Sequence, residues 1–447
     1  MKSSTCTKRL WVAFAFTFLV LASPLAGANY ILQFNAQANV AQLGSTYGFQ
    51  VVRALSQQSD VISTVNPLSD TALQALRTAM GVIGVEVDAE VDSSEDNESS
   101  RPNVTLESLA DVVAGSAPAN YFGAQVRSDY VTQRGTQMVR LAEEQASFGT
   151  GLGVVAIIDT GVDTTHPALR GALVAGYDFT RNSADTVSEL TDLDQSTVVI
   201  LDQTASIPLD SKIFPVQLSQ STVVILDQST VVILDDDTFP EAFGHGTMVA
   251  GLVHLIAPTA QIMPLKAFRS DGSANLSDIV RAIRFAADNG ANVISMSFDM
   301  PVLSPELQAA VTYAESKGAI LIAAAGNEGK SAYVYPATLT GVIGVGSVNY
   351  KDRRSPFSNY GRAARTSAPG EALVTTFPGN NYAGVWGTSF STALVSGAVT
   401  LMRQLQPRLH SSAVSDCLEA GVQIDQGMGD ARLDLVRSLT ACLHPDE

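Results

Sequence analysis

Long apolar runs alternate with amphipathic segments through the second half of the chain. The runs cover residues 153–158, 261–268, 292–298, 319–325 and 342–348. Between them, residues 277–289 and 305–317 repeat apolar positions at helical spacing. A strand that is apolar throughout is typical of a parallel sheet buried on both faces. The pattern predicts an α/β fold, a doubly wound parallel sheet with helices on both faces and its functional residues at the carboxyl ends of the strands.

A smaller unit is predicted ahead of this domain, at residues 29–91. Strand patterns at 30–34, 49–65 and 82–91 alternate with helical patterns at 40–47 and 70–80, and the second strand pattern breaks in the middle to form a pair. The resulting order β-α-β-β-α-β is that of a small ferredoxin-like α+β fold.

An acidic, polar linker is predicted at residues 92–130, because its first part (92–102) cannot pack a core. A removable pro-segment on an exposed tether and a permanent small domain both fit this arrangement.

The octad Gln-Ser-Thr-Val-Val-Ile-Leu-Asp occurs three times, at 195–202, 220–227 and 228–235. Each copy is rich in β-branched residues between turn formers, which favours a short strand. We therefore expect a β-rich repeat insertion at about 185–237 within a domain spanning 131–447. The aspartate run at 235–237 could bind a structural calcium ion through its oxygens. Such a run is more often a solvated surface, so no calcium site is located.

The N-terminus has the pattern of a secretory signal. Basic residues precede an apolar run at 10–22, and the small residues 26–28 form a cleavage signal, so residues 1–28 are predicted to be removed. This run is too short to span a membrane comfortably, and no later segment reaches the length that a span requires. We expect a secreted protein, extracellular or periplasmic, with no membrane attachment after signal removal.

Composition narrows the choice of partners. The 447 residues carry a net charge of −17, which argues against nucleic acid or an anionic membrane as a partner. Cys6 would leave with the signal, so Cys417 and Cys442 remain. In an oxidising compartment these two could form one disulfide, or they could stay unpaired.

Four residues that could carry chemistry stand in glycine-rich stretches where a strand meets a loop or a helix. They are Asp159, His245, Asn327 and Ser389. Each one alone has a structural explanation: a loop-capping aspartate, a histidine at a tight helix start, an ordinary turn residue and an N-cap serine.

Together the four residue types are more specific. A serine is a weak nucleophile that needs a base, and the base needs an orienting carboxylate. Ser389 is also predicted at the start of an apolar helix, where unpaired N–H groups favour a developing negative charge. The amide of Asn327 could donate to the oxyanion of a tetrahedral intermediate.

On these residues the chain resembles the subtilisin-like serine proteases, from about residue 154 to 406. The order Asp159, His245, Ser389 is the order of the catalytic residues in subtilisin. The resemblance implies that Asp159 orients the imidazole, that His245 is general base and then general acid, and that Ser389 is the nucleophile. It also implies an oxyanion hole formed by Asn327 and the backbone N–H of Ser389.

The resemblance extends to binding and processing. It implies that Ser297 and Gly326 contact a protein or peptide substrate, that no cofactor is required for the chemistry, and that the protein is a monomer. Residues 29–91 are similar to the family's inhibitory propeptide, which blocks the site until it is cut. The family therefore implies a self-processing zymogen of a serine endopeptidase.

The sequence also departs from the family. Asp299 and Met300 stand where glycine is usual one or two places after Phe298, in a wall of the primary specificity pocket, so substrate preference does not transfer. Four other departures remove no catalytic atom: Met248, Phe390, Ser391 and Ala393. Two alternatives remain, a catalytically inactive relative that binds peptides or partners in the same cleft, and an adhesion protein whose working surface is the octads.

Overall fold

The computed structural model describes residues 27–92, 117–193, 216–218, 221–226, 231–232, 240, 242–424 and 427–444. The predicted signal peptide, apart from its last two residues, lies outside these ranges. Among the described residues, no helix combines the length and apolar character needed to cross a membrane.

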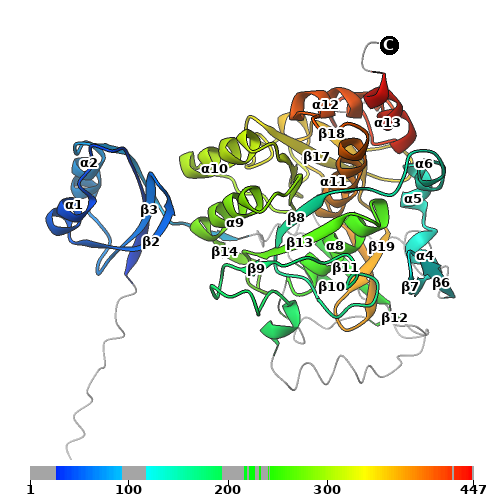
Figure 1. The fold of residues 1–447 in the computed structure, drawn as a ribbon, viewed down its shortest axis with the longest axis horizontal. Coiled ribbons are helices and arrows are strands. Elements are labelled where there is room, and N and C mark those ends of the chain that lie inside the picture. The colour runs from blue at the N-terminus through cyan, green and yellow to red at the C-terminus, as the bar shows by residue number, and fades with distance from the viewer. Residues whose placement is uncertain are drawn as a thin grey trace, which may run out of the picture.

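The larger part of the molecule is built on a seven-stranded parallel sheet (Figure 1). The strands run in the order β18-β17-β16-β15-β8-β13-β9, and every pairing in the sheet is parallel. The predicted α/β class is therefore confirmed. The strand bounds are β8 (Val154–Asp159), β9 (Tyr177–Asp178), β13 (Gln261–Lys266), β15 (Val293–Met296), β16 (Ile320–Ala324), β17 (Val342–Val348) and β18 (Thr366–Pro369).

Helices cover both faces of this sheet, and strand β8 shows why its sequence is apolar throughout. Val155 and Ile157 enter a core shared with helices α8 (His245–Ile256) and α11 (Thr388–Leu405). Ala156 and Ile158 enter a second core with α9 (Leu276–Asp288) and α10 (Pro305–Ser316). Alternate side chains of a strand point to opposite faces, so a strand buried on both sides needs apolar residues at every position.

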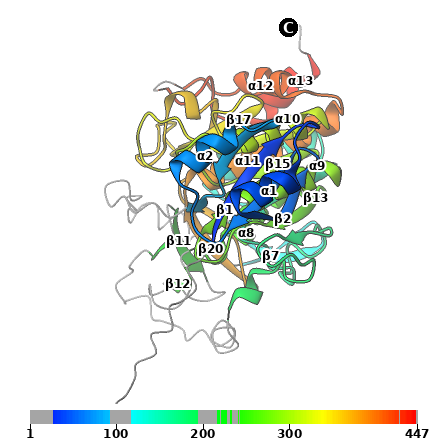
Figure 2. The same cartoon turned by 90° about the vertical axis from the view of Figure 1, so that its left-hand side faces the viewer.

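The N-terminal module folds separately as a four-stranded antiparallel sheet in the order β2-β3-β1-β4. Its elements follow the predicted β-α-β-β-α-β order: β1 (Ala28–Phe34), α1 (Val40–Tyr47), β2 (Phe49–Ser56), β3 (Ser59–Thr64), α2 (Asp70–Arg77) and β4 (Val82–Val87). One face of the sheet carries the helices, and the other lies against α9 and α10 (Figure 2).

The predicted linker 92–130 is partly folded. Strand β5 (Glu90–Asp92) leaves the module and pairs with β14 (Ser273–Asn275) of the larger part. From Ala117 the chain forms β6 (Pro118–Tyr121), β7 (Ala124–Arg127) and α4 (Ser128–Val131). The hydroxyl of Tyr121 donates to Leu255 O at 2.6 Å. The folded region therefore begins before residue 131, because buried aromatic residues follow the polar stretch. Helices α5 (Arg134–Met138) and α6 (Leu141–Ser147) come next.

The described part of the octad region adds β-structure to the larger part of the molecule. The second copy supplies β11 (Ser221–Leu226), which pairs antiparallel with β20 (Asn381–Trp386), next to β19 (Leu373–Phe377). Short strands β10 (Val216–Leu218) and β12 (Val231–Val232) pair with β11. The first copy lies outside the described residues. The predicted start at about 185 is too early, because η2 (Glu189–Asp192) is a 3₁₀ turn held by buried polar contacts near the sheet edge.

The C-terminal helices α12 (Ser411–Glu419) and α13 (Leu435–Leu443) pack on each other. A disulfide joins Cys417 to Cys442, with their Cα atoms 5.2 Å apart. Of the two alternatives left open by the sequence, the structure has the paired form.

Candidate active site

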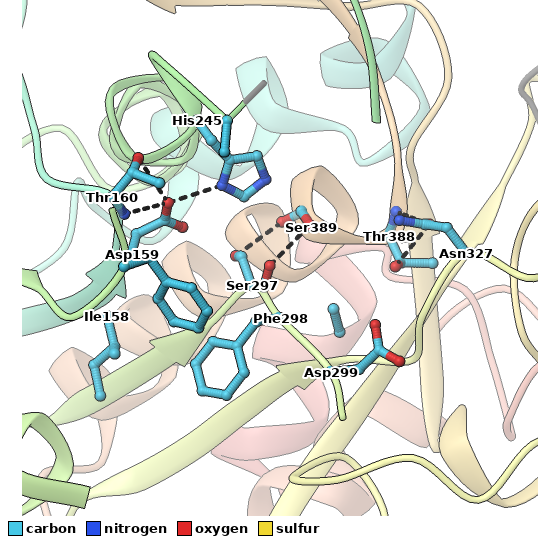
Figure 3. Close-up of a pocket in the computed structure, with 13 residues that line it drawn as sticks. Ile158, Asp159, Thr160, His245, Ser297, Phe298, Asp299, Asn327, Thr388 and Ser389 are labelled. Carbon is cyan, nitrogen blue, oxygen red and sulfur yellow. Dashed lines mark hydrogen bonds and ion pairs between the residues drawn. The ribbon is translucent and has the colours of Figure 1, made fainter. Parts of the chain in front are cut away.

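A pocket lies at the carboxyl ends of β8 and β15, where helices α8 and α11 begin (Figure 3). Five of the six residues singled out in the sequence line this pocket: Asp159, His245, Ser297, Asn327 and Ser389. The sixth, Gly326, precedes Asn327 and has a φ of +91°. A Cβ atom there would lie 2.5 Å from the Asn359 amide nitrogen and 2.9 Å from a carboxylate oxygen of Asp299, so the position requires glycine.

Asp159 and His245 form a hydrogen-bonded pair. The Nδ1 atom of His245 lies 2.8 Å from Oδ1 of Asp159, and both side chains are almost fully buried. The same carboxylate oxygen accepts from the backbone N–H of Thr160 at 2.8 Å. Burial lowers the pKa of His245, but the charges of Asp159 and Glu189 and the hydrogen bond with Asp159 outweigh it, and the pKa is raised. The pair favours an imidazole that accepts a proton.

Local backbone geometry places His245 at the first turn of α8. Gly244 precedes it with a φ of +88°, a left-handed conformation that favours glycine. A Cβ atom on Gly244 would come within 2.6 Å of the ring of Phe377. The glycine flanking the histidine, noted in the sequence, therefore serves both the turn and a close contact.

Ser389 is the second residue of α11 and is 5% exposed. Its hydroxyl donates to Ser297 O at 3.0 Å, and the hydroxyl of Ser297 donates back to Ser389 O at 3.3 Å. Within the described residues, the Ser389 hydroxyl thus donates to the neighbouring strand end and not to His245. The hydrogen bond between a nucleophile and its base often forms only when substrate is bound, and rotation about χ1 can redirect the Ser389 hydroxyl toward His245.

Asn327 follows the end of β16 and also lines the pocket. Its Oδ1 accepts from both the backbone N–H and the hydroxyl of Thr388, each at 2.9 Å. An amide nitrogen cannot accept a hydrogen bond, so these two donors fix the orientation of the amide. The Nδ2 group is left as a donor next to the N-terminus of α11, where the helix dipole also favours negative charge.

Glu189 belongs to the site although its sequence context gave no sign of it. Its carboxylate accepts from the backbone N–H groups of Gly246 and Thr247, at 3.1 and 3.2 Å, and from the hydroxyls of Thr160 and Thr247. A lone glutamate in a segment without apolar periodicity carries no sequence signal. Only its fold-dependent contact with the residues beside Asp159 and His245 reveals it.

Within the described ranges, no group of three or more His, Cys, Asp or Glu side chains is arranged to hold a metal ion. The aspartate run at 235–237 lies outside those ranges. A structural calcium ion therefore stays an unlocated expectation.

A parallel α/β sheet with these four side chains at one edge defines a subtilisin-like protein, and comparison with known proteins gives the same class. The model of the subtilase family matches residues 152–429. The chain belongs to the subtilase family.

Two curated relatives are similar over more than half of this chain. A thermophilic serine proteinase of Bacillus sp. (strain AK1) is 34% identical over 258 residues, which are 56% of this chain and 51% of the relative. Thermitase of Thermoactinomyces vulgaris is 31% identical over 281 residues, 60% of this chain and 81% of thermitase. The chain thus spans about half of the length of the first relative.

A solved structure has the same fold. Fervidolysin from Fervidobacterium pennivorans, described as a keratinolytic enzyme related to subtilisin, superposes with a TM-score of 0.66 at 21% identity. The match covers 93% of this chain and 61% of fervidolysin. At this identity the likeness concerns the fold alone.

Proposed function

We propose that the protein is a secreted serine endopeptidase made as a self-processing zymogen. The observation that carries the proposal is the hydrogen-bonded pair of Asp159 and His245 in the same pocket as Ser389 and Asn327. A thermophilic serine proteinase among the similar proteins supports it. An inactive relative would be expected to have lost one of these side chains, and all four are present.

Hydrolysis then follows from the geometry in two steps. In the first, Ser389 Oγ bonds to the substrate carbonyl carbon while His245 Nε2 takes the hydroxyl proton. His245 next gives this proton to the leaving amine as the C–N bond breaks, which leaves an acyl-enzyme. In the second, His245 deprotonates a water molecule that attacks the ester, and returns the proton to Ser389.

Charge develops at two places during these steps, and each has a partner in the site. The carbonyl oxygen becomes negative and can accept from Asn327 Nδ2 and the backbone N–H of Ser389. The imidazole becomes positive and lies against the carboxylate of Asp159. No cofactor takes part in this chemistry.

The N-terminal module is proposed to act as the intramolecular inhibitor. Its last strand, β5, pairs with β14 of the larger part. Val91 in that strand packs in the same hydrophobic cluster as Phe268 and Phe298, two residues that line the pocket. The last strand of the module thus packs in the same cluster as part of the pocket wall, which supports an inhibitory role for the module.

The proposal is tested with the purified, processed protein and an unstructured protein substrate such as casein. We expect new peptide termini to form, and we expect a serine-reactive fluorophosphonate to abolish their formation. Hydrolysis that resists the fluorophosphonate would contradict a serine nucleophile. A folded, processed protein that binds peptides but cuts none would favour the inactive relative.

A further inference from the structure

The turn η2 fits closely behind the pair of Asp159 and His245. The N–H of Val162 donates to Val187 O at 3.0 Å. A Cβ atom on Gly161, whose φ is +112°, would lie 2.5 Å from that same oxygen and 3.3 Å from Cγ of Glu189. Glycine at 161 therefore lets the segment 187–189 approach the chain directly after Asp159. This segment is a fitted part of the site and not a surface appendage.

Glu189 caps the helix that carries His245. Helix α8 begins after Gly244, which has no side chain and makes no cap hydrogen bond. The carboxylate of Glu189 accepts instead from the N–H groups of Gly246 and Thr247, which belong to the first turn of α8. Glu189 is 1% exposed, so water does not compete for these contacts. A carboxylate at a helix N-terminus also interacts favourably with the helix dipole.

The hydroxyl of Thr160 links Glu189 to Asp159. This hydroxyl contacts Oε1 of Glu189 closely and lies 3.2 Å from Oδ1 of Asp159. A hydroxyl has a single proton, so it donates to one carboxylate at a time. It also accepts from the N–H of Gly246 at 3.0 Å. The Thr160 hydroxyl thus lies between the two carboxylates and connects Glu189 to Asp159.

Charged groups near Glu189 lie on β8, α8 and β13. Asp159 on β8 and His245 on α8 line the pocket, and the charge of Lys266 on β13 also acts on Glu189. The Lys266 ammonium donates to Asp192 of η2 at 2.7 Å. Burial raises the pKa of Glu189 to about 7, and the charge of Asp159 adds to this, while the threonine hydrogen bonds and Lys266 oppose it.

Building on the proposed protease function, we propose that Glu189 is a positioning residue that holds His245 against Asp159 through the start of helix α8, and that its negative charge stabilises the protonated imidazole. The first effect should appear in kcat, because a small misplacement of a catalytic base slows proton transfer strongly. The second should appear in the pH dependence, because an additional negative charge near His245 favours its cationic form.

The test compares Glu189→Gln with the wild type in kcat, KM and the pH profile of kcat/KM on one peptide. Glutamine keeps the shape and removes the charge. We expect kcat to fall between about tenfold and a hundredfold with little change in KM. The acid limb of the profile should move to lower pH by less than about 0.5 unit, the size expected for one full charge lost within a few ångströms, because Glu189 with a pKa of about 7 is only partly ionised near neutral pH.

A second readout does not depend on activity. Histidine-selective NMR titration of the Ser389→Ala chain, with and without Glu189→Gln, should show the pKa of His245 moving down in the double variant. Glu189→Asp keeps the charge with a shorter reach, so the acid limb should return toward the wild-type position while kcat stays reduced. Glu144→Gln is the matched control, because Glu144 is also fully buried but lies on α6, away from the pocket.

The outcomes separate the two proposals. A wild type that hydrolyses no peptide ends the proposed function, and the His245 titration still decides the role of Glu189. An active wild type whose acid limb and His245 titration are unchanged by Glu189→Gln overturns the inference. If Glu189→Gln does not fold, Glu189→Asp decides: wild-type kcat in that variant would overturn the positioning role, and a tenfold loss at an unmoved acid limb would support it.

Discussion

Three helices of the larger part are capped by carboxylates from other parts of the chain, and they divide into two kinds. Helix α8 is capped by Glu189, which the same domain supplies and buries. Helices α9 and α10 are capped by the N-terminal module: Asp88 accepts from the N–H and hydroxyl of Ser277, and Glu86 accepts from the N–H of Glu306.

The two kinds of cap differ in whether the capped helix N-terminus could become exposed to water. Residues Glu86 and Asp88 are half-buried, and α10 keeps its own cap in Ser304. An N-terminus that returns to water when the module leaves finds new partners for its N–H groups. The N-terminus of α8 is enclosed, so its cap must be permanent. A carboxylate that caps a helix from another part of the chain can therefore either position an active-site residue or hold a removable module.

The largest effect is expected from Ser389→Ala, which should leave the N-terminal module and its two caps attached. If the enzyme's own site cuts the module off, the variant should lose both hydrolysis and maturation. Alanine fits among the small residues at the start of α11, so the fold should lose about 1 kcal/mol at most. Mass spectrometry of the secreted variant should show a chain beginning near Asn29.

The control for this variant is a trace of active wild-type enzyme, which should trim it within the polar stretch after Asp92, where cleavage concentrates in exposed segments. A fully processed Ser389→Ala chain from a host without other extracellular proteases would refute self-maturation.

Asn327→Ala should affect turnover and neither kind of cap. Loss of one oxyanion donor lowers kcat by about 10²–10³, a magnitude measured for such a donor in subtilisin, which belongs to the same family. Because Asn327 also accepts from Thr388, the start of α11 loses a partner as well, and Thr388→Val is the matched variant for the hydroxyl contact, since it keeps the backbone N–H. A loss of kcat below threefold in Asn327→Ala would show that Nδ2 does not serve the oxyanion.

A smaller effect is expected when the module loses its caps. In the Ser389→Ala chain, Glu86→Ala together with Asp88→Ala should speed removal of the module by trace wild-type enzyme severalfold, since each cap contributes about 1 kcal/mol. Asp60→Ala is the control on the same module, because Asp60 makes no cap contact with α9 or α10. Equal cleavage rates for the capless and control chains would mean that the caps do not hold the module.

The smallest effect is expected at Glu144, a buried glutamate that caps no helix. Glu144 is fully buried, its carboxylate oxygens have no hydrogen-bond partner in the described part of the chain, and burial raises its pKa to about 8. A raised pKa means that the folded state binds more protons, so this group costs stability as pH rises from about 4.5 to 8. Glu144→Gln should therefore gain in melting temperature relative to wild type between pH 5 and 8.

The measurement is thermal unfolding of both proteins, in the Ser389→Ala background, at several pH values. A constant difference in melting temperature across that range would show that Glu144 stays ionised and has a partner.

The sequence predicts the sheet and the four site residues for physical reasons that are local. Strand β8 is apolar at every position because both faces are buried, and Asp159 stands directly at its end. The sequence signal for His245, Asn327 and Ser389 is the presence of neighbouring glycines, which allow tight turns. Each of these signals lies within a few residues of the side chain that it identifies.

Other features depend on contacts between distant segments and could not be predicted. The pairing of β11 with β20 joins residues about 160 positions apart, and the octad pattern alone fixes no partner. Glu189 reaches α8 across 57 and 58 positions. A polar residue outside any periodic pattern shows its role only when the fold brings its partners together.

The most direct test of a serine nucleophile in this site is the mass of the fluorophosphonate adduct on the processed wild-type protein. We expect one phosphonyl group, located by peptide mapping on Ser389, with labelling slowed by Asn327→Ala and absent in Ser389→Ala. A folded, processed protein that stays unlabelled, or that carries the group on a different residue, would contradict a serine nucleophile at the start of α11.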